Sequence, residues 1–288
     1  MKFAVISDIH GNKDALDAVL KDIEKENVDS YIVAGDLITD FPDDSYVVNR
    51  IKGLTSNVIK GNREDYLIKW ENNVKTRALD KFDQYKSVKY TYESLSDFDR
   101  DYIKKLPENL VIKVNSKYSI RICHGSPFSM YDLILENGTE ELLEKSLNEI
   151  EENILICAHT HHPFYKWVNN KLIINTGSVG VHYSNNTLRS QYAVLEVDEE
   201  DVRIELKNIE YDFQALKDRV KNSKIYENVP IWTDLTIGSI EKSLDLNTEF
   251  VKEAISISKK NETFENGLID NETWDNLYID WKNKNKFK

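Results

Sequence analysis

The chain has 288 residues and a formal net charge of −12 at pH 7, with 40% hydrophobic and 31% charged residues. This composition is that of a soluble globular protein of one large domain or two small ones, and it excludes a disordered or fibrous chain. The negative charge argues against general binding of nucleic acids, which usually requires a basic face, but bound metal ions would still admit a phosphate substrate.

The first residues predict a strand rather than a signal peptide. Residues 3–6 are apolar and Asp8 follows almost at once, so the apolar stretch is too short for an export signal. No apolar run in the sequence approaches the roughly 20 residues that a membrane span needs. We therefore expect a cytoplasmic protein with no membrane partner.

Strand and helix patterns alternate in the first part of the chain. Residues 15–23 carry apolar side chains at helical spacing, 31–34 fit the next strand, 47–51 fit a helix and 58–59 a short strand. Strand–helix–strand units with right-handed crossovers imply a largely parallel, buried sheet.

The pattern changes from residue 66 to about residue 106. This stretch is polar, rich in aromatic residues and helical in its spacing, so we expect a helical insert. Its rings could form a lid that stacks on a nucleobase, but packing of the helices against one another is the favoured interpretation.

Strands resume after the insert and become antiparallel further along the chain. Asn169 and Asn170 are a hairpin turn signal, and a second, acidic turn follows at 198–201. Cys123 and Cys157 end apolar runs, so we expect them to be small buried strand residues without a disulfide. The expected strands are 110–114, 119–123, 154–157, 164–168, 172–174, 191–197 and 202–208.

From Tyr211 onward the sequence is mostly helical. We therefore predict a mixed α/β (α+β) core domain over residues 1–210, with the insert at about 66–106. A helical C-terminal extension over 211–288 should pack on or beside this core. The extension could cap a sheet, cover the site or mediate a homodimer, and the sequence leaves these alternatives open.

Polar residues gather where the predicted strands end. Five of the six histidines lie in three short clusters, each behind an apolar run, and two further runs end in Gly-Asp and Gly-Asn pairs. In open α/β sheets, ligands bind beyond the carboxyl ends of the strands, so the five segments should converge on one site. The side chains that this brings together are Asp8, His10, Asp36, Asn62, His124, His159 and His161.

This donor set predicts a centre of two divalent metal ions. Each cluster alone has an ordinary alternative, such as a capped turn for Asp8 and His10 or a hydrogen-bonded core histidine for His124. The whole set is too large for one ion, whereas two roughly six-coordinate ions that share a carboxylate would use it. Mixed imidazole and carboxylate ligands suit manganese first, with iron, zinc, cobalt or nickel as alternatives.

The order of these motifs resembles that of the calcineurin-like metallophosphoesterases, in particular the small bacterial and archaeal phosphodiesterase-type members. The resemblance covers roughly residues 1–210 and not the helical extension. Thr176 stands where the glycine-rich loop of the family has proline. The matching motifs are 7–12 (SDIHGN), 35–36 (GD), 61–64 (GNRE), 124–125 (HG), 158–161 (AHTH) and 175–180 (NTGSVG).

The resemblance implies a four-layer αββα sandwich of two mixed sheets flanked by helices, and it implies a metal-dependent phosphoric ester hydrolase. It also implies how the ligands divide between the two ions. One metal would be held by Asp8, His10 and His161, the other by Asn62, His124 and His159, with Asp36 as the bridge.

Arg63 departs from the family pattern. Many members have a histidine directly after the asparagine of this motif, where it contacts the phosphate or protonates the leaving group. An arginine holds its proton too tightly to act as a general acid. It can clamp a phosphate oxygen instead, which suggests a leaving group that needs little protonation or receives a proton from water or another residue.

Three further residues are candidates for contact with the substrate. Asn12 either hydrogen-bonds phosphate or caps the first helix. His162 either touches the substrate, contacts a metal-binding residue or faces solvent. His182 follows the glycine-rich loop and could reach the mouth of the site.

The expected reaction is hydrolysis of phosphodiester or nucleotide-type phosphate esters by a metal-bridging hydroxide. Two divalent ions and two aspartates leave about two positive charges, which suits a phosphate group. The expected partner is a small-molecule phosphate ester, with a diester favoured over a monoester. The alternatives are a serine/threonine protein phosphatase and a non-catalytic metal-binding scaffold of the same fold.

Overall fold

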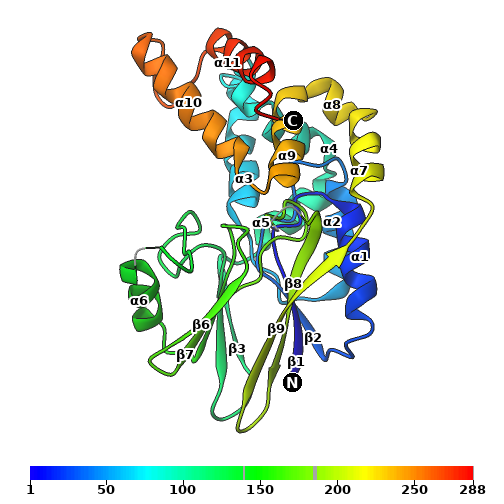
Figure 1. Cartoon of the computed structure of the whole chain (residues 1–288), viewed down its shortest axis with the longest axis vertical. Coiled ribbons are helices and arrows are strands. Elements are labelled where there is room, and N and C mark those ends of the chain that lie inside the picture. Colours follow the sequence, from blue (N-terminus) through cyan, green and yellow to red (C-terminus); the bar gives the residue numbers. More distant parts are fainter. Residues whose placement is uncertain (139, 184–186, 288) are drawn as a thin grey trace.

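Two mixed β-sheets face each other in the computed structural model, which describes residues 1–138, 140–183 and 187–287 (Figure 1). The first sheet has the order β2 (Ser30–Val33), β1 (Lys2–Ile6), β8 (Arg189–Val197), β9 (Val202–Glu210), and β1 and β2 are its parallel pair. The second has the order β3 (Asn109–Lys113), β4 (Ser119–Cys123), β5 (Ile154–Cys157), β7 (Lys171–Asn175), β6 (Phe164–Val168). Its three central strands are parallel and its edge strands antiparallel.

The short strand expected at 58–59 is reduced to a single parallel bridge between Val58 and Val33. The chain turns into a helix at Asn62, so too few residues remain to extend the pairing. The other expected strands agree with the observed ones to within a few residues at their ends.

The sheets bury an apolar core between them and carry helices on their outer faces. Ile120 and Ile122 of β4 face the first sheet, whereas Cys123 packs with helix α6 (Glu140–Glu149), because successive strand residues point to opposite sides. Helices α1 (Lys13–Ile23) and α2 (Asp44–Leu54) cover the outer face of the first sheet. This arrangement confirms the predicted αββα fold. Both cysteines are buried and unpaired, as expected.

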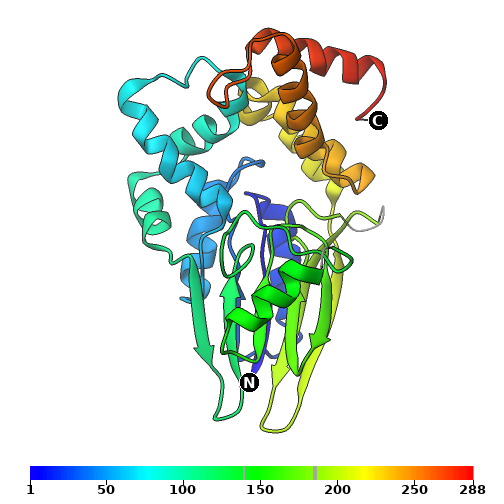
Figure 2. The same ribbon diagram turned by 90° about the vertical axis from the view of Figure 1, so that its left-hand side faces the viewer.

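The insert and the C-terminal helices lie at the same end of the two sheets (Figure 1, Figure 2). The insert contains α3 (Asn62–Thr76), a 3₁₀ turn (Asp83–Tyr85), α4 (Lys86–Ser94) and α5 (Asp97–Lys105). The C-terminal helices are α7 (Phe213–Lys221), α8 (Lys224–Asn228), α9 (Pro230–Lys242), α10 (Leu246–Lys260) and α11 (Asn271–Asn283). None of the helices in the described ranges is long and apolar enough to cross a membrane.

The two groups of helices contact each other over that end of the sheets. The side chain of Gln84 accepts a hydrogen bond from the backbone of Ile269 and donates one to Gly267, at 2.6 and 3.1 Å. Within the insert, the buried Trp70 packs against Tyr85 with ring centroids 5.9 Å apart. This ring contact supports the interpretation that the aromatic residues pack the helices together.

Candidate metal centre

The predicted donors converge beyond the carboxyl ends of β1, β2, β4 and β5. They form two groups, and in each group the ligand atoms of the carboxylate and the histidines lie within 4.8 Å of one another. Such a spacing could hold one ion per group. The groups are Asp8, His10 and His161 in one case and Asp36, His124 and His159 in the other.

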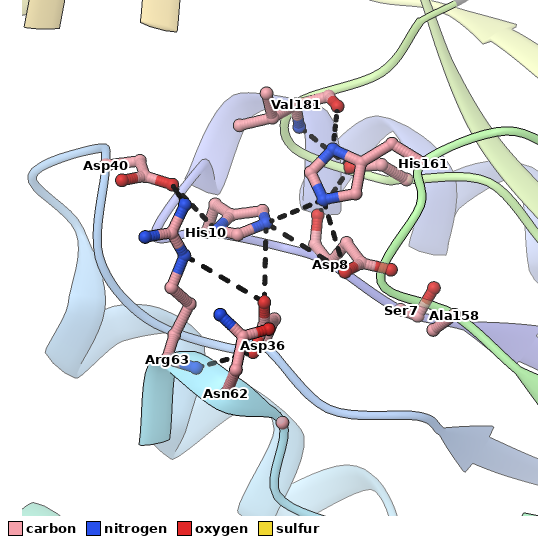
Figure 3. A network of polar contacts seen from close by, with 12 residues as sticks. Ser7, Asp8, His10, Asp36, Asp40, Asn62, Arg63, Ala158, His161 and Val181 are labelled. Atoms are coloured by element: carbon pink, nitrogen blue, oxygen red, sulfur yellow. Dashed lines mark hydrogen bonds and ion pairs between the residues drawn. The ribbon is translucent and has the colours of Figure 1, made fainter. Parts of the chain in front are cut away.

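The two groups adjoin each other, and Figure 3 shows Asp36 of the second group beside Asp8, His10 and His161 of the first. His161 Nε2 lies 3.3 Å from Asp8 Oδ1, and His124 Nε2 lies 3.4 Å from Asp36 Oδ2. His10 Nε2 is 4.0 Å from the Asp8 carboxylate and 3.9 Å from the Asp36 carboxylate. The structure therefore brings both aspartates and three histidine nitrogens into one compact cluster.

Five of these residues hold a left-handed backbone conformation that side chains other than glycine rarely adopt. Such a conformation costs about 1–3 kcal/mol for each residue and is found mainly at functional sites. It turns the side chains toward the centre at the point where each strand ends. The φ angles are 53° at Asp8, 53° at His10, 54° at Asp36, 68° at His159 and 58° at His161.

The carboxylate of Asp8 fits a bound cation. Asp8 is fully buried, and neither of its oxygens accepts a hydrogen bond from any described residue. Burial by itself would raise the pKa of Asp8, but His161 and His124 outweigh burial and lower it, so the group is an anion. A buried anion without donors is costly unless an ion compensates it. The donor set therefore suits divalent metal ions.

The histidine rings are held so that one nitrogen faces the centre. Nδ1 of His124 lies 2.8 Å from the carbonyl of Ala34, and Nδ1 of His161 lies 2.5 Å from the carbonyl of Val181. Each contact fixes the ring and turns Nε2 toward the two carboxylates, as second contacts to metal-binding histidines commonly do. Oδ1 of Asn62 is 3.0 Å from His124 Nε2, on the side of the second group.

The surroundings of the two carboxylates also shift the pKa values of the neighbouring histidines. Burial disfavours the charged ring of His124, but Asp36 and Asp8 outweigh it and raise its pKa to about 9. Burial and the neighbouring His124 lower the pKa of His159 to about 4, so this ring stays neutral.

Two buried carboxylates that the sequence reasoning missed support the centre. Glu64 accepts hydrogen bonds from the backbone N–H groups of Gly61, Asp36 and Leu37, at 2.7, 3.0 and 2.8 Å. It fixes the loop that carries Asp36 and caps α3, so the insert begins earlier than predicted. The spacing of Glu64 behind Gly61 is that of a capping box and could have been recognised. Asp40 is the second of these carboxylates, and no motif in the sequence around it points to its role.

The glycine-rich loop after β7 supports the backbone of Asp8. Oγ of Ser178 and the N–H of Gly180 both donate to the carbonyl of Asp8, at 2.8 and 2.9 Å. A Cβ atom at Gly180 would lie 1.9 Å from the carbonyl oxygen of Ile9, so a larger residue does not fit. The hydroxyl of Thr176 lies 3.1 Å from that of Ser7, on the strand that leads to Asp8.

Gly61→Ala should weaken metal binding without unfolding the protein. A Cβ atom at Gly61 would lie 2.2 Å from Asp36 Oδ1 and 2.8 Å from His124 Cε1, so both donors must move. We expect a loss of about 10–100-fold in Mn²⁺ affinity, measured by calorimetry. Gly53→Ala is the matched control, because a Cβ atom there meets no other atom within 4 Å. Equal affinities of the two variants would contradict this prediction.

Asp44→Asn should change how stability depends on pH. Asp44 is fully buried and accepts the N–H of Thr39 at 2.8 Å, and burial raises its pKa from 3.8 to about 7. The folded state therefore binds this proton more tightly than the unfolded state, so the contribution of Asp44 to the unfolding free energy falls as pH rises from about 4 to about 7.

Between pH 5 and pH 8 the wild type should lose on the order of 2 kcal/mol more unfolding free energy than Asp44→Asn. Urea unfolding in the presence of chelator measures this difference. Asp97→Asn is the control, because the Asp97 side chain is 91% exposed, and it should follow the wild type. Parallel pH profiles for the wild type and Asp44→Asn would contradict the prediction.

The candidates for substrate contact occupy different surroundings. Asn12 caps α1, since its Oδ1 accepts the N–H of Ala15 at 3.1 Å, and it is fully buried. His182 is also fully buried, with Nε2 3.0 Å from the Tyr211 hydroxyl. Arg63 is partly exposed next to Asp36, and His162 is exposed. A substrate role stays a prediction for all four, and only Arg63 and His162 have side chains accessible to a ligand.

Comparison with known proteins gives consistent similarities. The family model of the calcineurin-like phosphoesterase superfamily domain matches residues 1–200. An uncharacterized protein of Methanocaldococcus jannaschii is 24% identical over 244 residues, which are 78% of this chain and 93% of that protein. The structure of a hypothetical protein from Pyrococcus horikoshii OT3 is similar with a TM-score of 0.67 and 27% identity, over 80% of this chain and 97% of that one. A metallophosphoesterase from Sphaerobacter thermophilus shares the fold, with a TM-score of 0.63 and 22% identity over 77% and 94% of the two chains.

Proposed function

The chain belongs to the calcineurin-like phosphoesterase superfamily, and from this premise we propose that it hydrolyses phosphodiester or nucleotide-type phosphate esters with two divalent metal ions, manganese first among them. The observation that carries the proposal is the pair of buried carboxylates of Asp8 and Asp36. No described residue donates a hydrogen bond to Asp8. The Nε2 atoms of three histidines lie within 4.0 Å of Asp8, of Asp36 or of both. One ion would be held by Asp8, His10 and His161, the other by Asn62, His124 and His159, with Asp36 between them.

The charge of the site suits a phosphate group. When bound, two divalent ions supply Lewis-acid polarisation of phosphoryl oxygens and lower the pKa of water. Asp8 and Asp36 offset part of the positive charge, and the neutral side chains of the set add none. The remaining charge of about +2 favours a phosphate mono- or dianion over a neutral substrate.

Arg63 is proposed to clamp a phosphoryl oxygen. Its Nε is buried, has no hydrogen-bond partner in the described part of the chain and lies 4.0 Å from Asp36 Oδ2. Although burial disfavours the charged guanidinium, Asp40 and Asp36 raise the pKa of Arg63 above its ordinary value, so it donates a hydrogen bond and does not supply a proton. An unused donor beside the bridging carboxylate is suited to an anionic oxygen.

A cavity beside the centre is proposed to receive the rest of the ester. It has a volume of about 570 Å³, and its walls include His162, Tyr183 and Glu136. The ring of Tyr183 stacks on that of His161, with centroids 5.1 Å apart, so one wall of the cavity contacts the first group of ligands. Room for an organic group near the phosphoryl group suits an ester with a bulky substituent, such as a diester or a nucleotide.

Hydrolysis of a chromogenic phosphodiester and of the matching monoester tests the proposal. We expect turnover that requires Mn²⁺, stops with chelator, returns when Mn²⁺ is added back, and is faster for the diester. Absence of turnover of either ester with manganese, nickel, cobalt and zinc would contradict the proposal and favour a scaffold. Faster turnover of the monoester would contradict the preference for diesters alone.

A further inference from the structure

The C-terminal extension reaches the candidate metal centre through Trp232. Trp232 lies on α9 and is 192 residues away from Asp40 in the sequence, yet its indole N–H donates to Asp40 Oδ1 at 2.6 Å. Asp40 is 2% exposed and comes from the loop that also carries Asp36. A helix outside the part of the chain that the family model matches, residues 1–200, thus holds a buried carboxylate in the loop that follows β2.

The other oxygen of Asp40 contacts two residues of the site (Figure 3). Asp40 Oδ2 lies 2.9 Å from His10 Nδ1 and 3.1 Å from Arg63 Nη2. His10 Nδ1 is the nitrogen opposite the one that faces the carboxylates, so Asp40 occupies the place of a second contact to a metal-binding histidine. One carboxylate therefore joins a candidate ligand, the phosphate clamp and the indole of α9.

The local backbone and the indole ring support the same arrangement. Asp40 and the preceding Thr39 both hold left-handed backbone conformations, with φ of 76° and 74°, which turn the carboxylate inward. The guanidinium of Arg63 lies over the Trp232 ring, 5.7 Å from its centroid. Trp232 thus contacts Arg63 with its ring face and Asp40 with its N–H, so it restrains both members of the ion pair.

Three groups face the Asp40 carboxylate from three parts of the chain. They are the guanidinium of Arg63, the ring nitrogen Nδ1 of His10 and the indole N–H of Trp232. Asp40 therefore lies where it can restrain the ring of His10 as well as the guanidinium of Arg63.

We propose that the C-terminal extension completes the metal centre, with Trp232 fixing Asp40, and Asp40 in turn fixing the ring of His10 and the guanidinium of Arg63. Trp232 and Asp40 are positioning residues, since neither is placed to touch the reacting atoms. The part that concerns catalysis rests on the proposed function. The part that concerns metal affinity does not need a substrate.

Trp232→Phe and Asp40→Asn test this inference in the full-length protein. Trp232→Phe keeps a packed ring and removes the donor, and Asp40→Asn keeps the shape and removes the charge. We expect Mn²⁺ affinity to fall about 10-fold in Trp232→Phe and about 10–100-fold in Asp40→Asn, measured by calorimetry without substrate. With a substrate, kcat should fall more than KM rises, because Arg63 is proposed to contact the phosphoryl group and His10 to hold one of the ions.

Trp281→Phe is the matched control for damage to the extension. Trp281 is 1% exposed, and its indole N–H donates to a carboxylate, that of Glu253, at 2.9 Å, but it lies within the core of the C-terminal helices. It should bind Mn²⁺ as the wild type does. Wild-type affinity in both Trp232→Phe and Asp40→Asn, or an equal loss in Trp281→Phe, would overturn the inference. If the wild type hydrolyses no ester but the two variants still lose Mn²⁺ affinity, the proposed function fails and the inference stands.

Discussion

Asp36→Ala is expected to abolish metal-dependent hydrolysis, with a loss of at least ~10³-fold in kcat/KM. Asp36 lies between the two groups of ligands, with Oδ2 3.4 Å from His124 Nε2 and 3.9 Å from His10 Nε2. Asp36 Oδ1 accepts a hydrogen bond from the backbone N–H of Arg63 at 2.8 Å, so the substitution also frees the start of α3. Both ions should be weakened together, because Asp36 is the carboxylate proposed to bridge them.

The loss of both ions should also appear in stability. Mn²⁺ at about 100 times its dissociation constant should stabilise the wild type by roughly 2.7 kcal/mol and should not stabilise Asp36→Ala. Thermal unfolding with and without Mn²⁺ measures this. Asp22→Ala is the control. Asp22 lies on α1, accepts a hydrogen bond from the Tyr192 hydroxyl at 2.9 Å and takes no part in the centre. Full Mn²⁺-dependent turnover in Asp36→Ala would refute the ligand assignment.

Arg63→Ala should lower kcat by about 10²–10³-fold while Mn²⁺ affinity changes much less. The guanidinium offers the charge and the unused Nε–H that the proposed clamp requires, and it is not one of the proposed ligands. Arg63→Lys should recover only part of the rate, because an ammonium group keeps the charge but lacks the planar pair of donors. Steady-state kinetics with the diester and calorimetry with Mn²⁺ separate the two effects.

Arg121→Ala is the matched control for removal of a paired arginine. Arg121 forms an ion pair with Glu152 at 3.0 Å on the second sheet. The kcat of Arg121→Ala should equal that of the wild type. Wild-type kcat in Arg63→Ala would mean that the Nε–H does not contact the substrate, and an equal loss of Mn²⁺ affinity and rate would assign Arg63 to the metal site instead.

The arrangement of the candidate ligands could be predicted because each donor follows an apolar strand. Asp8 and His10 follow β1, His124 follows β4, and His159 and His161 follow β5. Parallel strands bring their carboxyl ends to the same edge of a sheet, so donors within one sheet are expected to meet. The donors of the two sheets meet because the sheets face each other. In each group, the ligand atoms of the aspartate and the histidines lie within 4.8 Å of one another, as expected if they meet at one ion.

The supporting residues were harder to predict, for reasons that differ among them. Glu64 has a local signal, since it lies one helical turn behind Gly61 and caps α3. Asp40 and Trp232 have none, because their hydrogen bond joins positions 192 residues apart. The fully buried environment of His182 against Tyr211 likewise depends on how α7 and its preceding segment return to the core.

The sequence by itself thus determined the fold class and the set of candidate ligands, because hydrophobic periodicity and the residues at strand ends are local properties of the chain. The tertiary structure alone decided that a carboxylate in the loop after β2 and an indole on α9 meet beside His10 and Arg63. Packing of two helical segments over one end of the sheets creates that contact. Such packing depends on side-chain shape across the whole molecule, and no short stretch of residues encodes it.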